Sequence, residues 1–390
     1  MKITDHGKSR SWNSEFALRE GLVYLNHAAV SPWPSRTAEA VCRFAAENAA
    51  QGALDYPRWA QIESVLRDQL RRLLNAPSRD DIALLKNTSE GLSLVAYGLP
   101  WRTGDNVVAA RQEFPSNRIV WQSLADRGVE LRLADLAGVV DPEDALLALT
   151  NRRTRLLTVS SVQYGNGLRM NLEKLGQACR RRGILFCIDA IQSLGALSFD
   201  AQACNADFVA ADGHKWLMAP EGIAVFFTSP AAREQLSLYQ YGWHMVATPG
   251  DFDRQDWEIA GDGRRFECGS PNMSGVHALQ ASLSLIEEVG IDRIANQILE
   301  NTRYLYHELA AIPGVRLLSA APLDRRSGIV TFHVESATAT VVVQQLWERD
   351  IISAARGGGI RFSPHFYTPQ GDLQTAVEAL RQILGDFSTS

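Results

Sequence analysis

The sequence predicts an α/β fold with a mainly parallel sheet, followed by a smaller α+β domain. Short apolar segments alternate with helical stretches between residues 81 and 228, which is the pattern of parallel strands joined by crossover helices. Beyond about residue 274 the pattern changes to long helices with a few strand candidates. A chain of 390 residues that is 46% hydrophobic can bury the cores of one large and one smaller domain.

Seven segments are expected to form the strands of the large domain. Each is short and apolar and is bounded by polar or turn residues. In chain order they read DIALL, DNVVAA, VELRLA, RLLTVSSV, ILFCID, DFVAA and GIAVFF. Helices are predicted in the gaps, for example over 90–99, behind an Asn-Thr-Ser cap signal, and over 172–182, before ILFCID.

The C-terminal part is expected to combine four helices with two strands. The helices are predicted over 276–288, 294–311, 338–349 and 373–384, and the strands read VRLLS and GIVTFHV. A glycine-rich polar stretch over 261–271 precedes this part. We therefore divide the chain into an N-terminal segment (1–30), a large domain (31–270) and a small domain (271–390).

Composition and charge point to a small-molecule enzyme of a reducing compartment. The chain has 39 basic and 44 acidic residues and no long basic block, so neither a nucleic acid nor a membrane is expected as a partner. Its five cysteines are scattered without a CxxC pair, and no histidines stand at metal-ligand spacing, so we expect free thiols and no metal. No apolar leader or run of about 18 apolar residues occurs, which favours the cytoplasm.

Lys215 and Asp189 are the most informative pair of residues. Lys215 stands in the polar turn Asp212-Gly213-His214-Lys215-Trp216, and Asp189 ends the strand candidate ILFCID. Lysine amines form imines with aldehyde cofactors, and pyridoxal phosphate (PLP) also needs a carboxylate at its ring nitrogen. Either residue alone has an ordinary interpretation, as a surface lysine or as a helix cap or metal ligand, so the pair carries the prediction.

Further polar groups and one aromatic ring follow other strand candidates, where ligands bind in open α/β sheets. Thr88 and Ser89 open a helix after DIALL and are either a phosphate cradle or an ordinary N-cap. Phe114 is either a ring that stacks on a planar cofactor or a core residue. Gln192, with Gln163 or Ser161, can reach a ring hydroxyl, and His214 is either structural or a phosphate ligand.

Taken together, these motifs resemble fold-type I PLP-dependent enzymes of the class V aminotransferase group, which includes cysteine desulfurases, selenocysteine lyase, kynureninase and isopenicillin N epimerase. The matching segments follow in order over nearly the whole chain: YLNHAAVSPWP, KNTSEGLSL, QEFPSN, SSVQYGNG, CIDAIQSLG, ADGHKWLMAPEGIAVFF, RRFECGSPN and IRFSPHFYTP. The resemblance implies a large domain with a mainly parallel seven-stranded sheet and a smaller α+β C-terminal domain.

The resemblance also implies the roles of individual residues. Lys215 and Asp189 would be catalytic, because the lysine would carry PLP as an imine and the carboxylate would pair with the pyridinium nitrogen. Gln192 would bind the ring oxygen. Further cofactor contacts would come from Thr88, Ser89, Phe114, Gln163, Asp212 and His214, with Gly269 and Ser270 completing the phosphate site of the other subunit in a homodimer. Substrate contacts would come from Asn26, His27, Trp243 and Arg361, the last as the clamp for an α-carboxylate.

Two departures from the desulfurase pattern bear on the reaction. Desulfurases carry a mobile-loop cysteine shortly before the arginine that matches Arg361, but here the segment reads IISAARGGGIR and contains no thiol. A persulfide on the enzyme is therefore not expected. Phe114 stands where desulfurases stack a histidine, and since a phenyl ring exchanges no proton, Lys215 is left as the main acid and base.

The first interpretation of function is therefore an aminotransferase-like reaction at the α-carbon of a small amino acid. A lyase reaction, on a C–S bond or of the kynureninase type, and an epimerisation are the alternatives. Trp243 either lines a substrate pocket, as the similarity of its segment to kynureninase and the epimerase suggests, or packs at a subunit contact. A PLP-binding scaffold without turnover is less favoured, because it would need none of the chemistry of Lys215, Asp189 and Arg361.

Overall fold

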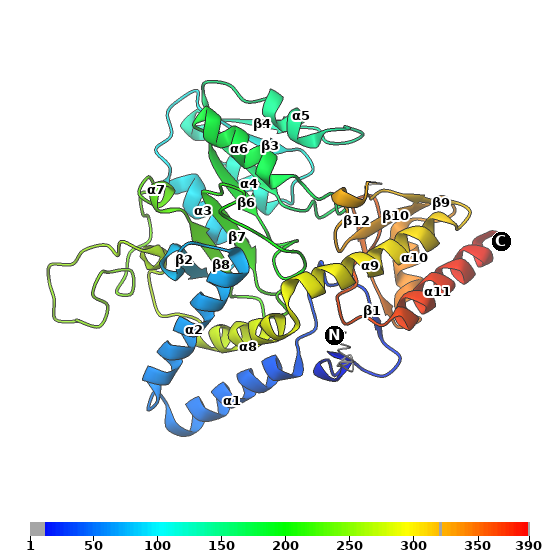
Figure 1. Cartoon of the computed structure of the whole chain (residues 1–390), viewed down its shortest axis with the longest axis horizontal. Coiled ribbons are helices and arrows are strands. Elements are labelled where there is room, and N and C mark those ends of the chain that lie inside the picture. The colour runs from blue at the N-terminus through cyan, green and yellow to red at the C-terminus, as the bar shows by residue number, and fades with distance from the viewer. Residues whose placement is uncertain (1–11, 320–321, 389–390) are drawn as a thin grey trace, which may run out of the picture.

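The computed structural model describes residues 12–319 and 322–388 and has a larger and a smaller part (Figure 1). A seven-stranded sheet with the order β2-β8-β7-β6-β5-β3-β4 forms the centre of the larger part. Its strands are β2 (Ile82–Leu85), β3 (Asn106–Ala110), β4 (Glu130–Ala134), β5 (Thr154–Ser160), β6 (Leu185–Asp189), β7 (Phe208–Asp212) and β8 (Ala224–Thr228). Only β8 runs antiparallel to its neighbours in this sheet, which confirms the predicted fold class and all seven strand segments.

Helices cover both faces of this sheet because its strands are apolar on both sides. One hydrophobic cluster joins Val159, Ile188 and Val209 to α2, α5, α6 and α8, and a second joins the alternate residues Leu156 and Cys187 to α3, α4 and α7. The helices are α1 (Ser35–Gln51), α2 (Tyr56–Leu74), α3 (Thr88–Gly98), α4 (Ser116–Gln122), α5 (Pro142–Ala148), α6 (Leu172–Arg182), α7 (Pro230–Arg233) and α8 (Met273–Val289). Short 3-10 turns are η1 (Trp12–Glu15), η2 (Arg79–Asp81), η3 (Ala125–Arg127), η4 (Gly263–Phe266) and η5 (Leu323–Arg325).

The smaller part is an antiparallel sheet with the order β12-β13-β10-β9, packed against three helices. Its strands are β9 (Val315–Leu317), β10 (Val330–Val334), β12 (Ala354–Arg356) and β13 (Gly359–Phe362), and its helices are α9 (Ile291–Ala310), α10 (Ala339–Trp347) and α11 (Gln370–Ser388). The N-terminal strand β1 (Val23–Tyr24) pairs in parallel with β11 (Ile351–Ile352). The described N-terminal segment therefore adds Val23 and Leu25 to the core of the smaller part.

Helix α9 links the two parts of the molecule. Its residues Ile294 and Ile298 belong to the core of the large sheet, whereas Leu305 and Leu309 belong to the core of the smaller part. The division at residues 270 and 271 stays a prediction, and α8, which begins just after it, packs on α1 and α2.

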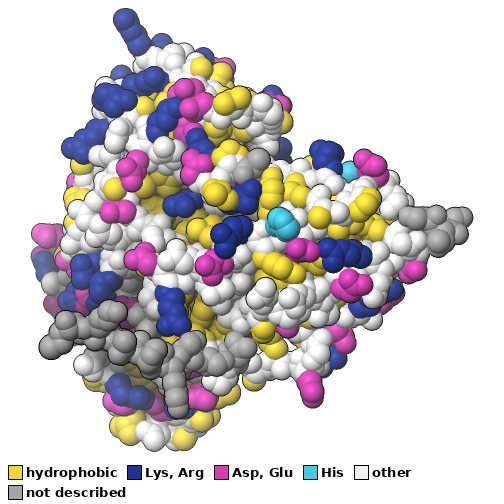
Figure 2. Space-filling model, turned by 45° about the vertical axis from the view of Figure 1, so that its right-hand side comes forward, with side chains coloured by type: hydrophobic (Ala, Val, Ile, Leu, Met, Phe, Trp, Pro, Cys, Tyr) yellow, Lys and Arg dark blue, Asp and Glu magenta, His cyan; other side chains and the backbone are white. Residues whose placement is uncertain are grey.

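The surface carries charges of both signs. Basic and acidic side chains are interspersed over the face shown in Figure 2, in line with the small net charge of −5. Within residues 12–319 and 322–388, no helix combines the length and the apolar character that a membrane span requires.

Candidate active site

Lys215 stands in a constrained turn at the carboxyl end of β7. Within the turn the amide of Met218 donates to the carbonyl of Lys215 at 3.0 Å. Met218 has a φ of 55°, a left-handed conformation that a bulky side chain rarely adopts. It is held there because its side chain is fully buried and its carbonyl accepts a hydrogen bond of 2.8 Å from Ser282 Oγ. Strain of this kind persists where the surroundings fix one conformation, and Met218 is joined to the lysine by the hydrogen bond within the turn.

Asp189 ends β6, the strand next to β7, so it lies at the same edge of the sheet as Lys215. Asp189 and Lys215 are both buried, with exposed fractions of 2% and 8%. Burial lowers the pKa of Lys215 and raises the pKa of Asp189, while their mutual attraction opposes both shifts. The amine of Lys215 is therefore more readily neutral than that of a surface lysine, which suits a nucleophile.

Phe114 covers the lysine from the loop after β3. Its ring centroid lies 5.4 Å from Lys215 Nζ, and its edge meets the ring of Tyr164 at 5.2 Å. Phe114 is 39% exposed, so it is not a core residue, and it stands where a planar ligand bound to Lys215 could stack on it.

The four residues predicted to bind phosphate follow β2 and β7. Asn87 caps α3 by accepting a hydrogen bond from Glu90 N at 2.9 Å, which leaves Thr88 Oγ1 buried without a partner. Ser89 Oγ donates to Ser116 Oγ at 2.8 Å. His214 Nδ1 lies 3.0 Å from Asp212 Oδ1, and neither atom has another partner.

Several of the buried polar atoms without a hydrogen-bond partner belong to predicted site residues, while others, such as Gln69 Oε1 and Arg233 Nε, lie elsewhere. Buried polar groups in proteins are almost always hydrogen bonded, so those at the site fit a polar ligand. The atoms are Asn26 Oδ1, Thr88 Oγ1, Gln163 Oε1, Asp212 Oδ1, His214 Nδ1 and Arg361 Nε. Together with an amine and a carboxylate, this set of donors and acceptors fits the aldehyde, the ring and the phosphate of PLP.

Gln192 is held by two hydrogen bonds inside the protein. Its Nε2 donates to Ala28 O at 3.0 Å, and its Oε1 accepts from Trp216 Nε1 at 2.9 Å. A primary amide has two N–H donors, so one of them remains for the predicted contact with a ring oxygen.

Arg361 enters the site from β13 of the smaller part. It is 2% exposed, and its Nη1 donates to Tyr164 O at 3.0 Å, which leaves the edge with Nε for an anion. Burial lowers the pKa of Arg361 to about 10, so the guanidinium is still charged near neutral pH. A buried, charged and incompletely paired arginine is suited to a carboxylate ligand.

The segment before Arg361 is a tight hairpin. β12 and β13 pair in antiparallel register and are joined by Gly357 and Gly358, whose φ values are 60° and 79°. A Cβ on Gly357 would lie 2.2 Å from the carbonyl oxygen of Gly165, so only glycine fits this contact. A two-residue turn therefore stands at this place, and the hairpin sequence contains no cysteine.

Other predicted residues are engaged elsewhere. His27 lies between Ser363 O at 2.8 Å and the hydroxyl of Tyr367 at 2.7 Å, so it offers no free ring nitrogen to a substrate. Trp243 is 40% exposed and lines a cavity of about 410 Å³ that contains none of the other predicted site residues. Gly269 and Ser270 line a different cavity, of about 270 Å³, which does not include Lys215. Their contribution to a neighbouring subunit stays a prediction.

Sequence reasoning missed Glu113 and Tyr164 as members of the site. Tyr164 contacts Phe114 with its ring and holds Arg361 with its carbonyl. Glu113 is a fully buried carboxylate next to Phe114 and bonds to Gln163. The signal was an acidic residue three positions after an apolar strand, inside the segment QEFPSN.

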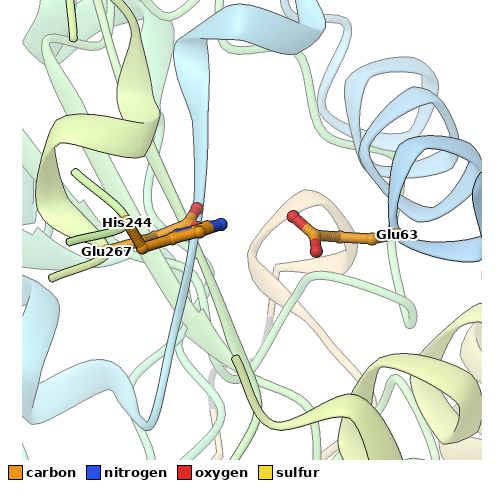
Figure 3. A group of neighbouring side chains, drawn as sticks. All are labelled: Glu63, His244 and Glu267. Carbon is orange, nitrogen blue, oxygen red and sulfur yellow. The ribbon is translucent and has the colours of Figure 1, made fainter. Parts of the chain in front are cut away.

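Among the described residues, one further group brings three possible metal ligands together. Glu63, His244 and Glu267 have ligand atoms within 4.8 Å of one another (Figure 3). However, Arg67 Nη2 donates to Glu63 at 2.6 Å and to Glu267 at 2.7 Å. The guanidinium therefore already supplies the positive charge between these carboxylates, and we assign no metal to them.

Comparison with known proteins defines the class to which this fold and site belong. The model of the family "Aminotransferase class-V" matches residues 23–368, and the chain belongs to this family. It is 29% identical over 389 residues to a probable cysteine desulfurase of Methanothermobacter thermautotrophicus, with 93% of this chain and 95% of that protein covered. It is 30% identical to the cysteine desulfurase of Salmonella newport, with 80% and 78% covered.

Solved structures show the same fold. The apo cysteine desulfurase of Thermococcus onnurineus NA1 has a TM-score of 0.86 at 22% identity, with 99% of both chains covered. The cystine C-S lyase C-DES, in complex with its reaction product cysteine persulfide, also has a TM-score of 0.86, at 23% identity, with 92% of this chain and 97% of that chain covered.

Proposed function

We propose that this protein is a PLP-dependent lyase that breaks the C–S bond of a sulfur-containing amino acid. The observation that carries the proposal is the buried pair of Lys215 and Asp189 at neighbouring strand ends, with the buried and incompletely paired Arg361 entering from the smaller part. Several relatives are named cysteine desulfurases, and one structural neighbour is a cystine C-S lyase that releases cysteine persulfide.

The residues of the site divide the work of such a reaction. Bound PLP supplies an electron sink for the bonds of the substrate α-carbon. Burial lowers the pKa of Lys215, so its amine is more readily neutral and can take the proton from the α-carbon as general base. Arg361 grips the α-carboxylate through the edge with its free Nε, and Asp189 holds the proton of the ring nitrogen. Phe114 lies over Lys215 on one side of the site, where its ring can stack on a planar ligand.

The names of the relatives favour the lyase alternative over transamination, which was the first interpretation of the sequence. In a β-elimination, cysteine and water give pyruvate, ammonia and hydrogen sulfide, and cystine and water give pyruvate, ammonia and cysteine persulfide. Neither reaction requires a thiol of the enzyme. The hairpin at Gly357 and Gly358 supports this route, because no cysteine stands on it to receive sulfur.

A panel of amino acids tests the proposal. We would incubate the purified holoprotein with cysteine, cystine, alanine, aspartate and kynurenine and measure sulfide, pyruvate, ammonia, D-amino acids and the aminated cofactor. The expected result is pyruvate and ammonia in equal amounts from a sulfur-containing substrate, and none from the Lys215→Ala variant. Turnover of alanine or aspartate with stoichiometric aminated cofactor would instead establish transamination, and D-amino acids would establish epimerisation.

The proposal extends to the assembly and the location of the protein. We place the active protein in the cytoplasm, in line with free cysteines, and as a homodimer in which Gly269 and Ser270 add donors to the phosphate site of the partner. Sedimentation velocity of wild type and Ser270→Ala, with and without PLP, tests the dimer. A monomer that is fully active and retains tight PLP binding would remove the shared site.

A further inference from the structure

Glu113 is a buried carboxylate that collects hydrogen bonds from several elements. It is 3% exposed and follows β3. Its oxygens accept from Ser160 N at 2.9 Å, from Ser160 Oγ, from Gln163 Nε2 at 2.8 Å and from Asn117 Nδ2 at 3.0 Å. These donors come from the end of β5, the loop that follows it and helix α4. A buried charge with this many donors is satisfied and rigidly placed.

The network continues behind Glu113, which limits how its members can rearrange. Asn117 Oδ1 accepts from Trp121 Nε1 at 2.9 Å and from Thr158 Oγ1 at 2.8 Å. The carbonyl end of Asn117 is thus occupied, and only its amino end can face Glu113. The side chain of Glu113 is therefore held from both sides.

Glu113 fixes the orientation of the Gln163 side chain. Burial raises the pKa of Glu113, and the four hydrogen bonds donated to its oxygens oppose that shift and favour the ionised form. An ionised carboxylate can only accept hydrogen bonds, so the amino group of Gln163 faces it. The carbonyl oxygen of Gln163 is then turned away, and it is buried without a partner. The amide consequently presents an acceptor to whatever lies on its other side.

This acceptor belongs to the same edge of the sheet as the catalytic pair. Ser160, which donates twice to Glu113, is the register partner of Asp189 across β5 and β6. Phe114, the residue after Glu113, lies over Lys215. Burial is the main cause that raises the pKa of Asp189, and the nearby charge of Glu113 acts in the same direction.

We propose that Glu113 is a positioning residue of the cofactor pocket, which holds Gln163 so that its carbonyl oxygen accepts a hydrogen bond from the ring hydroxyl of bound PLP. The role rests on the proposed function only in requiring that the protein binds PLP. It explains why a costly buried carboxylate stands behind the site without touching the lysine. It also predicts that Glu113 and Gln163 act as one unit.

A double-mutant cycle on PLP affinity tests this coupling. Equilibrium dialysis of the full chain against graded PLP would give dissociation constants for wild type, Glu113→Gln, Gln163→Leu and the double variant. Each single change is expected to weaken PLP binding roughly tenfold. The double variant is expected to bind PLP no more weakly than the single variant with the lower affinity, because both changes remove the same hydrogen bond. Losses that multiply to roughly a hundredfold in the double variant would overturn the proposal.

Two further variants separate positioning from general damage. Glu143→Gln is the matched control, because Glu143 is also fully buried but pairs with Arg325 at 2.6 and 2.8 Å and with Asn171 N, away from the catalytic pair. It is expected to lower the midpoint of urea unfolding and to leave PLP affinity within about twofold of wild type. A loss of PLP affinity equal to that of Glu113→Gln would overturn the specific role of Glu113.

Glu113→Asp keeps the negative charge, but its shorter side chain moves the carboxylate away from Gln163. The Glu113→Asp variant replaces Glu113→Gln in the cycle if Glu113→Gln does not fold. It is expected to lose PLP affinity in the wild-type background and not in the Gln163→Leu background. An unchanged affinity in both would contradict the proposal. PLP binding is measured without turnover, so a protein that binds PLP but cleaves no C–S bond would remove the proposed lyase function and leave the test of Glu113 intact.

Discussion

Replacement of His27 by asparagine should make the stability of the protein less sensitive to acid. His27 is fully buried, and burial lowers its pKa to about 4, against a hydrogen bond to the carbonyl of Ser363 that acts in the opposite direction. Because the pKa in the folded state lies below the ordinary value of 6.5, the unfolded chain binds more protons. The contribution of the neutral His27 to the free energy of unfolding is therefore complete above about pH 6.5, and it is lost as the pH falls toward about 4.

The size of this effect follows from the two pKa values. Between about pH 8 and pH 5, His27 alone should remove about 2 kcal/mol from the free energy of unfolding. His365 acts in the same direction, because burial and the neighbouring His27 ring, 5.2 Å away, lower its pKa as well. Asparagine at position 27 keeps a donor for Ser363 O but cannot take up a proton. The part of the pH dependence of stability that comes from His27 is therefore absent from the variant. At about pH 8 the variant should be less stable by about 1 to 3 kcal/mol, because the Tyr367 hydroxyl loses its partner.

Urea unfolding of wild type and His27→Asn at several pH values measures this difference. Fluorescence and circular dichroism should give coincident transitions for the comparison to hold. The pH dependence of PLP binding is common to both proteins and cancels in the difference. His307→Asn is the control, because the side chain of His307 is exposed on α9, and its slope should equal that of wild type. If His27→Asn keeps the full acid sensitivity of wild type, the neutral buried histidine is not the cause.

Three further outcomes are expected at the site. Borohydride reduction of the holoprotein should place a pyridoxyl group on Lys215, and peptide mapping that finds it on another lysine would contradict the assignment. Arg361→Ala should lower kcat/KM by roughly two orders of magnitude, with PLP affinity unchanged, because a desolvated carboxylate contact is lost; steady-state kinetics on the best substrate decide this. Turnover with cysteine should leave no persulfide on any of the five cysteines, and mass spectrometry that detects one would refute a route without an enzyme thiol.

The sequence predicted the large sheet well because the signal for its strands is local. Each strand is a short apolar run bounded by turn residues, and the helix over 172–182 has both its cap and its final glycine in the sequence. The placement of Lys215 and Asp189 at one edge of the sheet was predictable because parallel strands bring their carboxyl ends together, so order along the chain implies proximity. Local pattern was therefore sufficient for the framework and for the position of these two residues, whose catalytic roles stay a prediction.

Features that depend on distant partners were not predictable in the same way. β1 and β11 come from distant parts of the chain, and each has only two residues, which is too short to show the alternation of a strand. The substrate contact of His27 was implied by the resemblance, and its actual partners, Ser363 and Tyr367, come from the C-terminal part, where no local pattern reveals them. Glu113 was overlooked because an acidic residue after a strand is ordinarily solvated, and its burial becomes visible only with the donors of β5 and α4 in place.

The contact between the hairpin and the loop after β5 joins substrate recognition to the cofactor pocket. Gly357 packs against Gly165, and the preceding residue of that loop, Tyr164, holds Arg361 with its carbonyl and Phe114 with its ring. One loop thus contacts both Arg361, the proposed carboxylate clamp, and Phe114, the ring beside Lys215. A cysteine at position 357 would place its Cβ 2.2 Å from the carbonyl oxygen of Gly165, so the close approach of the two segments admits no thiol there. Under the proposed lyase reaction, sulfur is therefore expected to leave the site on the substrate fragment or as sulfide.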